Sequence, residues 1–293
     1  MARESRADRS GEGLVPLGRQ PGKVLKALAR TWQRQRRRVL RDPTPETVHR
    51  LRTAARRLEA AGRIAGEQFG LVETVPWTDW GSLNSKLSRL RNLDVTRQIL
   101  AEIQPEGPTM PEALRQRLAE LAQERKRVRR KATKKLERRG SGHIARLAAR
   151  LASRLSPPVD LTRAARRWWA RAGETFTIDP DLGQSLGQAL RRHSGRAAVH
   201  QVRIQLRNLR YGLEWWTALG LVVSPKVIAF LQDTQDTLGR IRDTQRAATA
   251  LVGPKHRRAR SAVMAARRTE LARWPSVVKR SDLLRASPFE RTP

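Results

Sequence analysis

The sequence of 293 residues contains no cysteine, a single tyrosine, four phenylalanines and only 27 acidic residues. The absence of cysteine excludes disulfide bonds, thiolate metal ligands and a cysteine nucleophile. No apolar run approaches the roughly 18 residues of a membrane span, and residues 1–16 lack the apolar core of a secretory signal peptide. We therefore expect a cytoplasmic protein that does not enter the membrane, with residues 1–16 forming a disordered leader.

Basic residues greatly outnumber acidic ones. The 61 Lys and Arg give a formal net charge of +34, and only ten of them are Lys, so that arginine predominates. A chain with this charge repels itself and repels cationic ligands, and an anionic partner relieves that repulsion. The composition therefore favours a protein that binds a polyanion over an ordinary metabolic enzyme.

Hydrophobic periodicity and helix-breaking residues divide the chain into helices. Apolar residues recur at helical spacing in the long segments, and no segment alternates with the period of two that indicates a strand. Breaks rich in proline and glycine occur at Asp42–Pro45, Pro105–Pro108 and Ser156–Pro158. The predicted fold class is all-α. The expected helices are 21–40, 45–69, 79–103, 111–139, a short one ending at 155, 164–172, 182–192, 196–219, 225–252 and 255–274.

Two motifs recur in the sequence at the same separation of 151 residues. The matched segments are VHRLR (48–52) with VHQVR (199–203), and LSRLRN (87–92) with LGRIRD (238–243). Because a single shift without a gap aligns both motifs, we interpret the chain as a duplication. We expect residues 17–155 and 156–293 to form two four-helix bundles that are related by a pseudo-two-fold axis.

A basic stripe lies beside the apolar stripe on the repeated helix. Its residues follow one another at intervals of three and four, which places them on one helical face. The stripe comprises His49, Arg52, Arg56 and, two turns further on, Arg63 in the first half, and His200, Arg203, Arg207 and Arg210 in the second. A solvated helical face usually carries acids and bases spaced at i, i+4. In this stripe the only acids are Glu59 and Glu214, which lie near its C-terminal end. We therefore interpret the stripe as an anion-binding surface.

The segments TVHRLRTAARRLEA (47–60) and AVHQVRIQLRNLRYGLE (198–214) resemble the duplicated signature of the CHAD domain, the conserved histidine α-helical domain. The segments LSRLRNLDV and LQDTQDTLGRIRD are similar to companion motifs of that family, and the resemblance spans the chain from about residue 17 to SPFE near its end. The resemblance implies two four-helix bundles around a shared basic cavity. It also implies inorganic polyphosphate as the ligand and an association with polyphosphate granules.

The resemblance also implies which residues contact the polymer. It assigns this role to His49, Arg52, Arg56, Arg57 and Arg91 in the first half, and to His200, Arg203, Arg207, Arg210 and Arg242 in the second. To these we add the bases Lys23, Lys26 and Arg30, which recur at helical spacing on the first predicted helix. Arginine suits such a ligand because its planar fork binds phosphate oxygens in a bidentate manner. Whether the basic helix predicted at 111–139 also contributes is left open.

The sequence lacks a recognisable catalytic motif, and we predict that the protein is not an enzyme. The segment Gly18–Val24 resembles a phosphate-binding loop, but its glycine spacing is short and Val24 replaces the Ser or Thr that would bind Mg²⁺, so we interpret it as a helix start. His49 and His200 lack neighbours at metal-ligand spacing, and the aspartates Asp233, Asp236 and Asp243 are interpreted as partners of arginines. We predict no metal and no cofactor.

Two alternatives to polyphosphate binding remain at this point. The sequence pI of about 11.9 would also suit non-specific binding of DNA or RNA, although aromatic residues are few and the pairs Trp168–Trp169 and Trp215–Trp216 are expected in the core. The chain would also suit an accessory domain that regulates an enzyme of phosphate metabolism.

Overall fold

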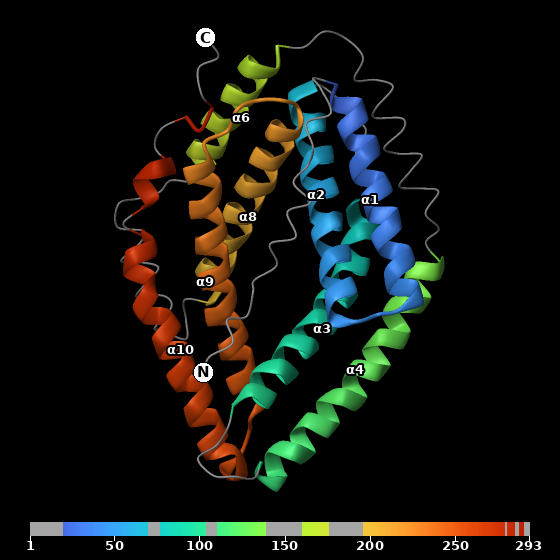
Figure 1. Cartoon of the computed structure of the whole chain (residues 1–293), viewed down its shortest axis with the longest axis vertical. Coiled ribbons are helices and arrows are strands. Elements are labelled where there is room, and N and C mark those ends of the chain that lie inside the picture. The colour runs from blue at the N-terminus through green and yellow to red at the C-terminus, as the bar shows by residue number, and fades with distance from the viewer. Residues whose placement is uncertain are drawn as a thin grey trace.

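The computed structural model describes residues 20–69, 77–103, 110–138, 160–175, 196–278, 280–284 and 287–289. Within these ranges there are eight α-helices and two 3₁₀ turns, and the only β-type pairing is an isolated bridge between Val223 and Phe289. The predicted all-α class is confirmed. The elements, labelled as in Figure 1, are α1 (Pro21–Arg41), α2 (Pro45–Phe69), α3 (Trp77–Glu102), α4 (Glu112–Arg138), α6 (Leu161–Thr175), α8 (Arg196–Ala218), α9 (Pro225–Ala250), η2 (Pro254–His256), α10 (Arg257–Val278) and η3 (Ser281–Leu284).

Proline and threonine set the start of the first two helices. Pro21 and Pro45 occupy the first position of α1 and α2, where the missing N–H would have had no helical acceptor. Thr44 caps α2, because its Oγ1 accepts a hydrogen bond of 3.2 Å from the backbone N–H of Thr47. α1 begins at Pro21, which confirms a helix start within the described residues 20–24.

The helix borders differ from the sequence expectation mainly at the C-terminal helix. Residues Pro254–His256 form a 3₁₀ turn, so α10 begins at Arg257, and it continues through Pro275 to Val278 instead of ending at Trp274. Pro275 is tolerated because it lies in the last turn, where it removes a single hydrogen bond. The predicted leader, the helices expected at 182–192 and up to 155, and the boundary between residues 155 and 156 lie outside the described residues.

Helices α1 to α4 form a closed four-helix arrangement, which is the first of the two predicted bundles. α1 packs against α2 and α4, and α3 also packs against α2 and α4. The apolar positions of the helical pattern are the buried ones, with Leu51, Ile64, Leu87 and Leu136 fully buried. Burial of such a side chain stabilises the fold by about 1.5–3 kcal/mol.

The helices of the second half pack in the same order as those of the first. α8 packs against α9 and α9 against α10, as α2 packs against α3 and α3 against α4. Contacts of α2 with α8 and of α3 with α9 join the two groups. α2 and α8 run in the same direction at the centre of the molecule, whereas α4 and α10 lie on opposite outer sides (Figure 1). This arrangement is the one that the predicted pseudo-two-fold axis requires, while a common origin of the two halves stays a prediction.

Tryptophan side chains fix α6 against the centre of the fold. The ring of Trp168 lies 6.3 Å from that of Trp216, and both residues are buried, as is Trp215. Gly212 of α8 faces the Trp168 ring so closely that an added Cβ would lie 2.1 Å from it. Trp168, Trp215 and Trp216 are thus core residues, as the sequence indicated, whereas Trp169 is only half-buried and packs against the core.

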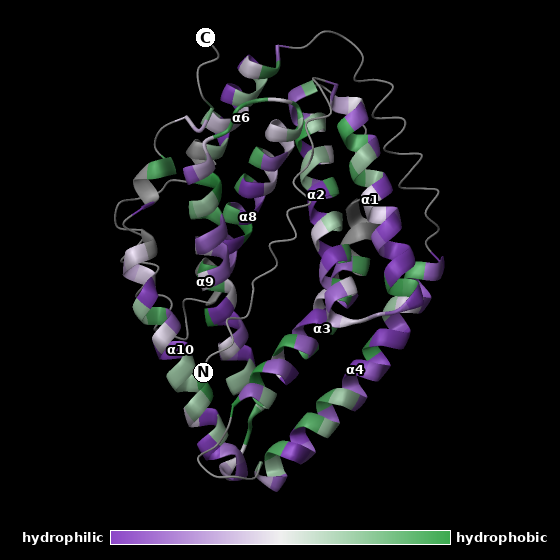
Figure 2. Cartoon of the chain, in the orientation of Figure 1, coloured by the Kyte–Doolittle hydropathy of each residue, from purple (hydrophilic) through white to green (hydrophobic). Residues whose placement is uncertain are grey.

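Polar residues are distributed unevenly over the helices. In the described residues no helix is both long enough and apolar enough to cross a membrane. Hydrophilic residues predominate on the C-terminal halves of α1 and α4, which approach each other at one side of the molecule (Figure 2). The guanidinium of Arg36 joins these two halves, because its Nε donates to the carbonyl oxygen of Leu136 at 2.9 Å.

Candidate anion-binding site

Four central helices carry most of the basic residues that the sequence singled out. α2 lies against α8, α3 lies against α9, and the pairs α2–α3 and α8–α9 complete the arrangement. Six half-buried arginines on these helices are called the arginine cluster here: Arg52 and Arg56 of α2, Arg91 of α3, Arg203 and Arg207 of α8, and Arg242 of α9.

The guanidinium groups of the cluster lie close enough to repel one another. The charges of Arg56, Arg91 and Arg203 all act on Arg52. Arg203 is in turn repelled by three members of the cluster, of which Arg242 has the largest effect. The repulsion therefore spans all four helices and acts between residues of both halves of the chain.

Burial and repulsion together lower the pKa of the clustered arginines. Burial is the larger cause and neighbouring guanidinium charges are the next, and together they lower the pKa of Arg52 to about 9 and that of Arg203 to about 10. The pKa values of Arg207 and Arg242 are also lowered, again first by burial and then by nearby arginines. All of these groups remain protonated at neutral pH, so the cluster holds its positive charge at a cost in free energy.

Within the described part of the chain, no carboxylate forms an ion pair with a member of the cluster. Asp243 pairs with Arg246 at 2.8 Å instead, and Glu59 acts on Arg207 only through its field. The Nε of Arg203 is buried and has no hydrogen-bond partner there. A buried donor without a partner is unfavourable by about 1–3 kcal/mol, and more if it is charged. Among the described residues, the cluster is therefore a set of charged donors without a paired carboxylate.

His200 is joined to the cluster through Arg242. Its Nδ1 lies 3.1 Å from Nη1 of Arg242. Because a guanidinium donates hydrogen bonds and cannot accept them, Nδ1 must be the acceptor, so the imidazole is neutral and carries its proton on Nε2. The ring retains solvent exposure, yet desolvation by its neighbours, followed by the charges of Arg242, Arg203 and Arg207, lowers the pKa of His200.

We predict that binding of a polyanion makes His200 take up a proton. In the free protein the lowered pKa keeps the imidazole neutral at pH 7, and an anion that compensates the arginine charges raises this pKa. Affinity should therefore increase as the pH falls from about 7.5 to 5.5. Isothermal titration calorimetry in buffers of different ionisation enthalpy measures the protons taken up. The variant His200→Asn should take up fewer, and equal uptake by both proteins would contradict the prediction.

Arg57 and Arg210, which were also predicted to contact the ligand, share one carboxylate. The Nε of Arg57 donates to Oε2 of Glu214 at 2.7 Å, and the Nε of Arg210 lies 3.7 Å from Oε1, an ion pair too long for a hydrogen bond. The guanidinium of Arg210 also lies over the ring of Tyr211, 4.8 Å from its centroid. Sequence reasoning missed this pairing because Arg57 and Glu214 are 157 positions apart.

The other predicted contact residues lie on the first two helices. Lys23, Lys26 and Arg30 are exposed on α1, which packs against α2 and α4 at the outer side of the molecule (Figure 1). His49 is half-buried on α2, one turn before Arg52. The structure thus brings together the stripe arginines Arg52, Arg56, Arg203 and Arg207, whereas the α1 bases are exposed on a helix that packs, within the described residues, against α2 and not against α8.

The acidic residues of the second half serve as partners of arginines. Asp233 pairs with Arg280 at 2.9 Å and Asp243 with Arg246, as predicted. Asp236 is the exception, because it forms no ion pair with the described residues; burial raises its pKa, and Arg210 and Arg240 act on it only through their charges. Among the described residues no three His, Asp or Glu side chains gather in a group that would hold a metal ion.

Known proteins resemble this chain in sequence pattern and in fold. A CHAD domain family model matches residues 23–252. The crystal structure of the CHAD domain from the plant Ricinus communis superimposes with a TM-score of 0.64 at 21% identity, covering 94% of this chain and 96% of that one. PptA from Streptomyces chartreusis superimposes with a TM-score of 0.54 at 21% identity, covering 92% of this chain and 100% of that one.

These two likenesses show a shared fold. A search of curated proteins found no match to this sequence. Because the family model spans well over half of the chain, the protein belongs to the CHAD domain family.

Proposed function

We propose that the protein binds inorganic polyphosphate through the arginine cluster and holds it without hydrolysing it. The observation that carries this proposal is the gathering of six arginines from four helices, with no carboxylate of the described residues paired to any of them. Natural proteins seldom leave so many buried like charges uncompensated, since each lowers the stability of the folded state. A bound polyanion would supply the missing negative charge.

The chemistry of the cluster fits a polymer of phosphates. Polyphosphate carries about one negative charge per phosphate and has no bases that a protein could recognise. It therefore needs several cations at close spacing, each able to bind two oxygens, and arginine meets this need better than lysine because of its planar fork. The members of the cluster are all arginine. We further propose that this binding recruits the protein to polyphosphate granules.

The position of the tryptophans argues against recognition of nucleic acid. Proteins that hold single strands stack the bases on exposed aromatic rings. Here Trp168, Trp215 and Trp216 are buried in the core, where they cannot stack on a ligand. Nucleic acid would then bind only through its phosphates, by the field of the +34 net charge.

A competition experiment tests the proposal directly. Labelled long-chain polyphosphate is bound at near-physiological salt and then challenged with equal amounts of charge as polyphosphate, duplex DNA, RNA or heparin. We expect unlabelled polyphosphate to displace the label at concentrations at least tenfold lower than the other polyanions. Equal displacement by DNA or RNA would show that the protein responds to charge alone, and the proposed function would then be wrong.

A further inference from the structure

The arginine cluster ends abruptly at the next turns of α2 and α8. Positions separated by 151 residues carry two bases each at His49/His200, Arg52/Arg203, Arg56/Arg207 and Arg91/Arg242. The next two pairs along the same face carry one acid and one base each, namely Glu59 with Arg210 and Arg63 with Glu214. Since α2 and α8 run side by side in the same direction, these mixed pairs lie on the side of the cluster toward the C-terminal ends of the two helices (Figure 1).

Glu214 neutralises two arginines at this boundary. Its two carboxylate oxygens lie 2.7 Å from Nε of Arg57 and 3.7 Å from Nε of Arg210. The Glu214 side chain is only 15% exposed, so its charge is poorly screened by solvent. Arg57 and Arg210 belong to the basic set predicted from the sequence, but this carboxylate already occupies them. The acid therefore separates the uncompensated arginines from the compensated ones.

A fixed carboxylate at this position opposes a phosphate chain that extends along the stripe. It repels phosphate oxygens and it competes with them for both guanidinium groups. We propose that Glu214 is the electrostatic end of the polyphosphate site and thereby limits the number of phosphates that the chain engages. This inference rests on the proposed function. Glu59 of α2 adds a second negative charge at this end of the site, and its charge acts on Arg207.

Helix geometry indicates how much the limit matters. The uncompensated stripe on α8 extends from His200 to Arg207, which is about 10 Å along the helix axis at 1.5 Å per residue. The distance from Arg207 to Glu214 adds about two more turns, which is also about 10 Å along the axis. Removal of the acid would therefore make roughly twice the length of helix available to the polymer.

The test compares wild-type protein with Glu214→Gln in binding to long-chain polyphosphate over a series of salt concentrations. The variant removes the carboxylate that competes with phosphate for Arg57 and Arg210, which allows up to two more phosphate contacts. The slope of log affinity against log salt should become steeper by about 1.4–1.8, at 0.7–0.9 per contact, and the affinity at 100 mM salt should rise about tenfold. Glu59→Gln, which breaks no ion pair between described residues, should steepen the slope by less than one.

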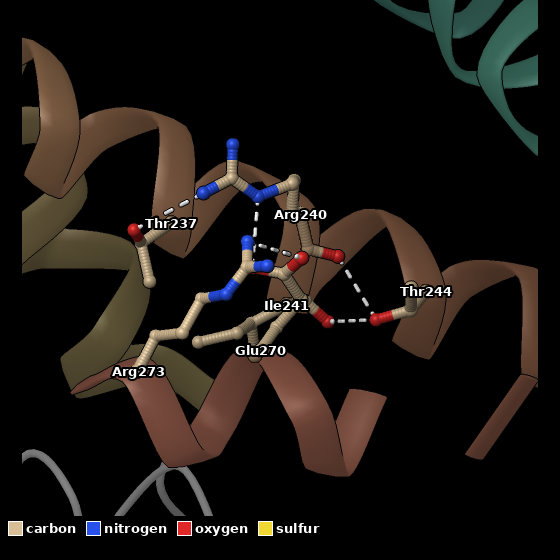
Figure 3. A network of polar contacts seen from close by, with 6 residues as sticks. All are labelled: Thr237, Arg240, Ile241, Thr244, Glu270 and Arg273. Atoms are coloured by element: carbon tan, nitrogen blue, oxygen red, sulfur yellow. Dashed lines mark hydrogen bonds and ion pairs between the residues drawn. The ribbon is translucent and has the colours of Figure 1, made fainter. Parts of the chain in front are cut away.

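Glu270 provides a matched control for the loss of a carboxylate that bridges two arginines. It is 14% exposed and lies 2.8 Å from Nε of Arg240 on α9 and 3.4 Å from Nη1 of Arg273 (Figure 3). Glu270 belongs to α10, which, among the described helices, packs mainly against α9 and not against α2 or α8. Glu270→Gln makes the same change in net charge and likewise frees two arginines. We expect it to leave the salt slope unchanged.

The outcomes separate this inference from the proposed function. Failure of the wild-type protein to bind polyphosphate would overturn the proposed function itself. If the wild-type protein binds, and the slopes of Glu214→Gln and Glu59→Gln match those of wild type or of Glu270→Gln, the end-stop role is wrong while the proposed function stands. Thermal unfolding of each variant identifies any loss of folding. If Glu214→Gln does not fold, Glu59→Gln decides the question.

Discussion

Replacement of Arg52, Arg56, Arg203 and Arg207 by alanine is expected to lower the affinity for long-chain polyphosphate by at least about 100-fold. A hydrogen bond to a charged partner contributes about 1.5–3 kcal/mol, so even a fraction of four such contacts accounts for this loss. The salt dependence should weaken as well, with a slope smaller by about three to four, because four fewer phosphates are neutralised. Fluorescence anisotropy with labelled polymer at several salt concentrations measures both quantities.

A control variant on α4 tests whether the position of the four basic residues, or only their number, determines the affinity for polyphosphate. Lys126, Arg127, Arg130 and Lys131 are exposed on this helix, whose C-terminal half is strongly hydrophilic (Figure 2) and which packs against α1 and α3. Their replacement by alanine removes the same four charges from the molecule. We expect an affinity loss below about fivefold from this general reduction of the field. Equal losses in both variants would mean that polyphosphate binds diffusely, without a site.

The second large effect is a gain in stability when one arginine of the cluster is removed. We expect Arg52→Met to raise the melting temperature of the free protein by about 3 °C and to weaken polyphosphate binding at the same time. Burial and the charges of Arg56, Arg91 and Arg203 lower the pKa of Arg52 from the ordinary value of arginine to about 9. Without solvent screening, such a pKa shift would correspond to a destabilisation of several kcal/mol. Because solvent screens the charges, we expect Arg52→Met to increase the free energy of unfolding by about 1 kcal/mol. For a chain of this size that amounts to the stated change in melting temperature.

The sign of this effect follows from proton linkage. The folded state lowers the pKa of Arg52, so the folded state binds its proton less tightly than the unfolded state does. The resulting destabilisation is therefore present in full at every pH below about 9 and disappears only as the pH rises above this value. Differential scanning calorimetry of the free protein between pH 6 and 8 should show the gain throughout.

Arg125→Met is the matched control, because Arg125 is a half-buried arginine with a partner. Its Nε donates to Oδ1 of Asp94, whose side chain is 2% exposed, and its Nη2 donates to the carbonyl oxygen of Pro43 at 3.0 Å. The substitution leaves the buried Asp94 without its cation, which costs about 3–5 kcal/mol, so the melting temperature should fall. A fall with Arg52→Met as well would contradict the view that the cluster is strained in the absence of ligand.

The helices themselves could be predicted from the sequence because their signals are local. The apolar spacing of Val48, Leu51 and Leu58 marked the buried face of α2, and the pair Thr44–Pro45 marked its first turn; both are confirmed. The end of α10 was predicted wrongly because a proline in a last turn removes only one hydrogen bond, which the rule for helix breakers does not anticipate.

Prediction of the site was more limited, since a helical wheel gives the face of a residue and not its partner. The wheel placed Arg52 and Arg203 on their stripes, and the shift of 151 residues related the two stripes to each other. Which arginines would be neutralised depends on how α2 and α8 cross, and the sequence contains no local signal for that. The bridge from Arg57 to Glu214 therefore became visible only in the fold.

The unpaired state of the arginine cluster has a consequence for the lifetime of the protein in a cell. Proteases degrade the transiently unfolded fraction of a protein, and any ligand that binds only the folded form reduces this fraction. The empty protein retains the unfavourable repulsion between Arg52 and Arg203, whereas a bound polymer would offset it. Under the proposed function, molecules that carry polymer would outlast empty ones, so the amount of protein would follow the supply of polymer without any change in its synthesis.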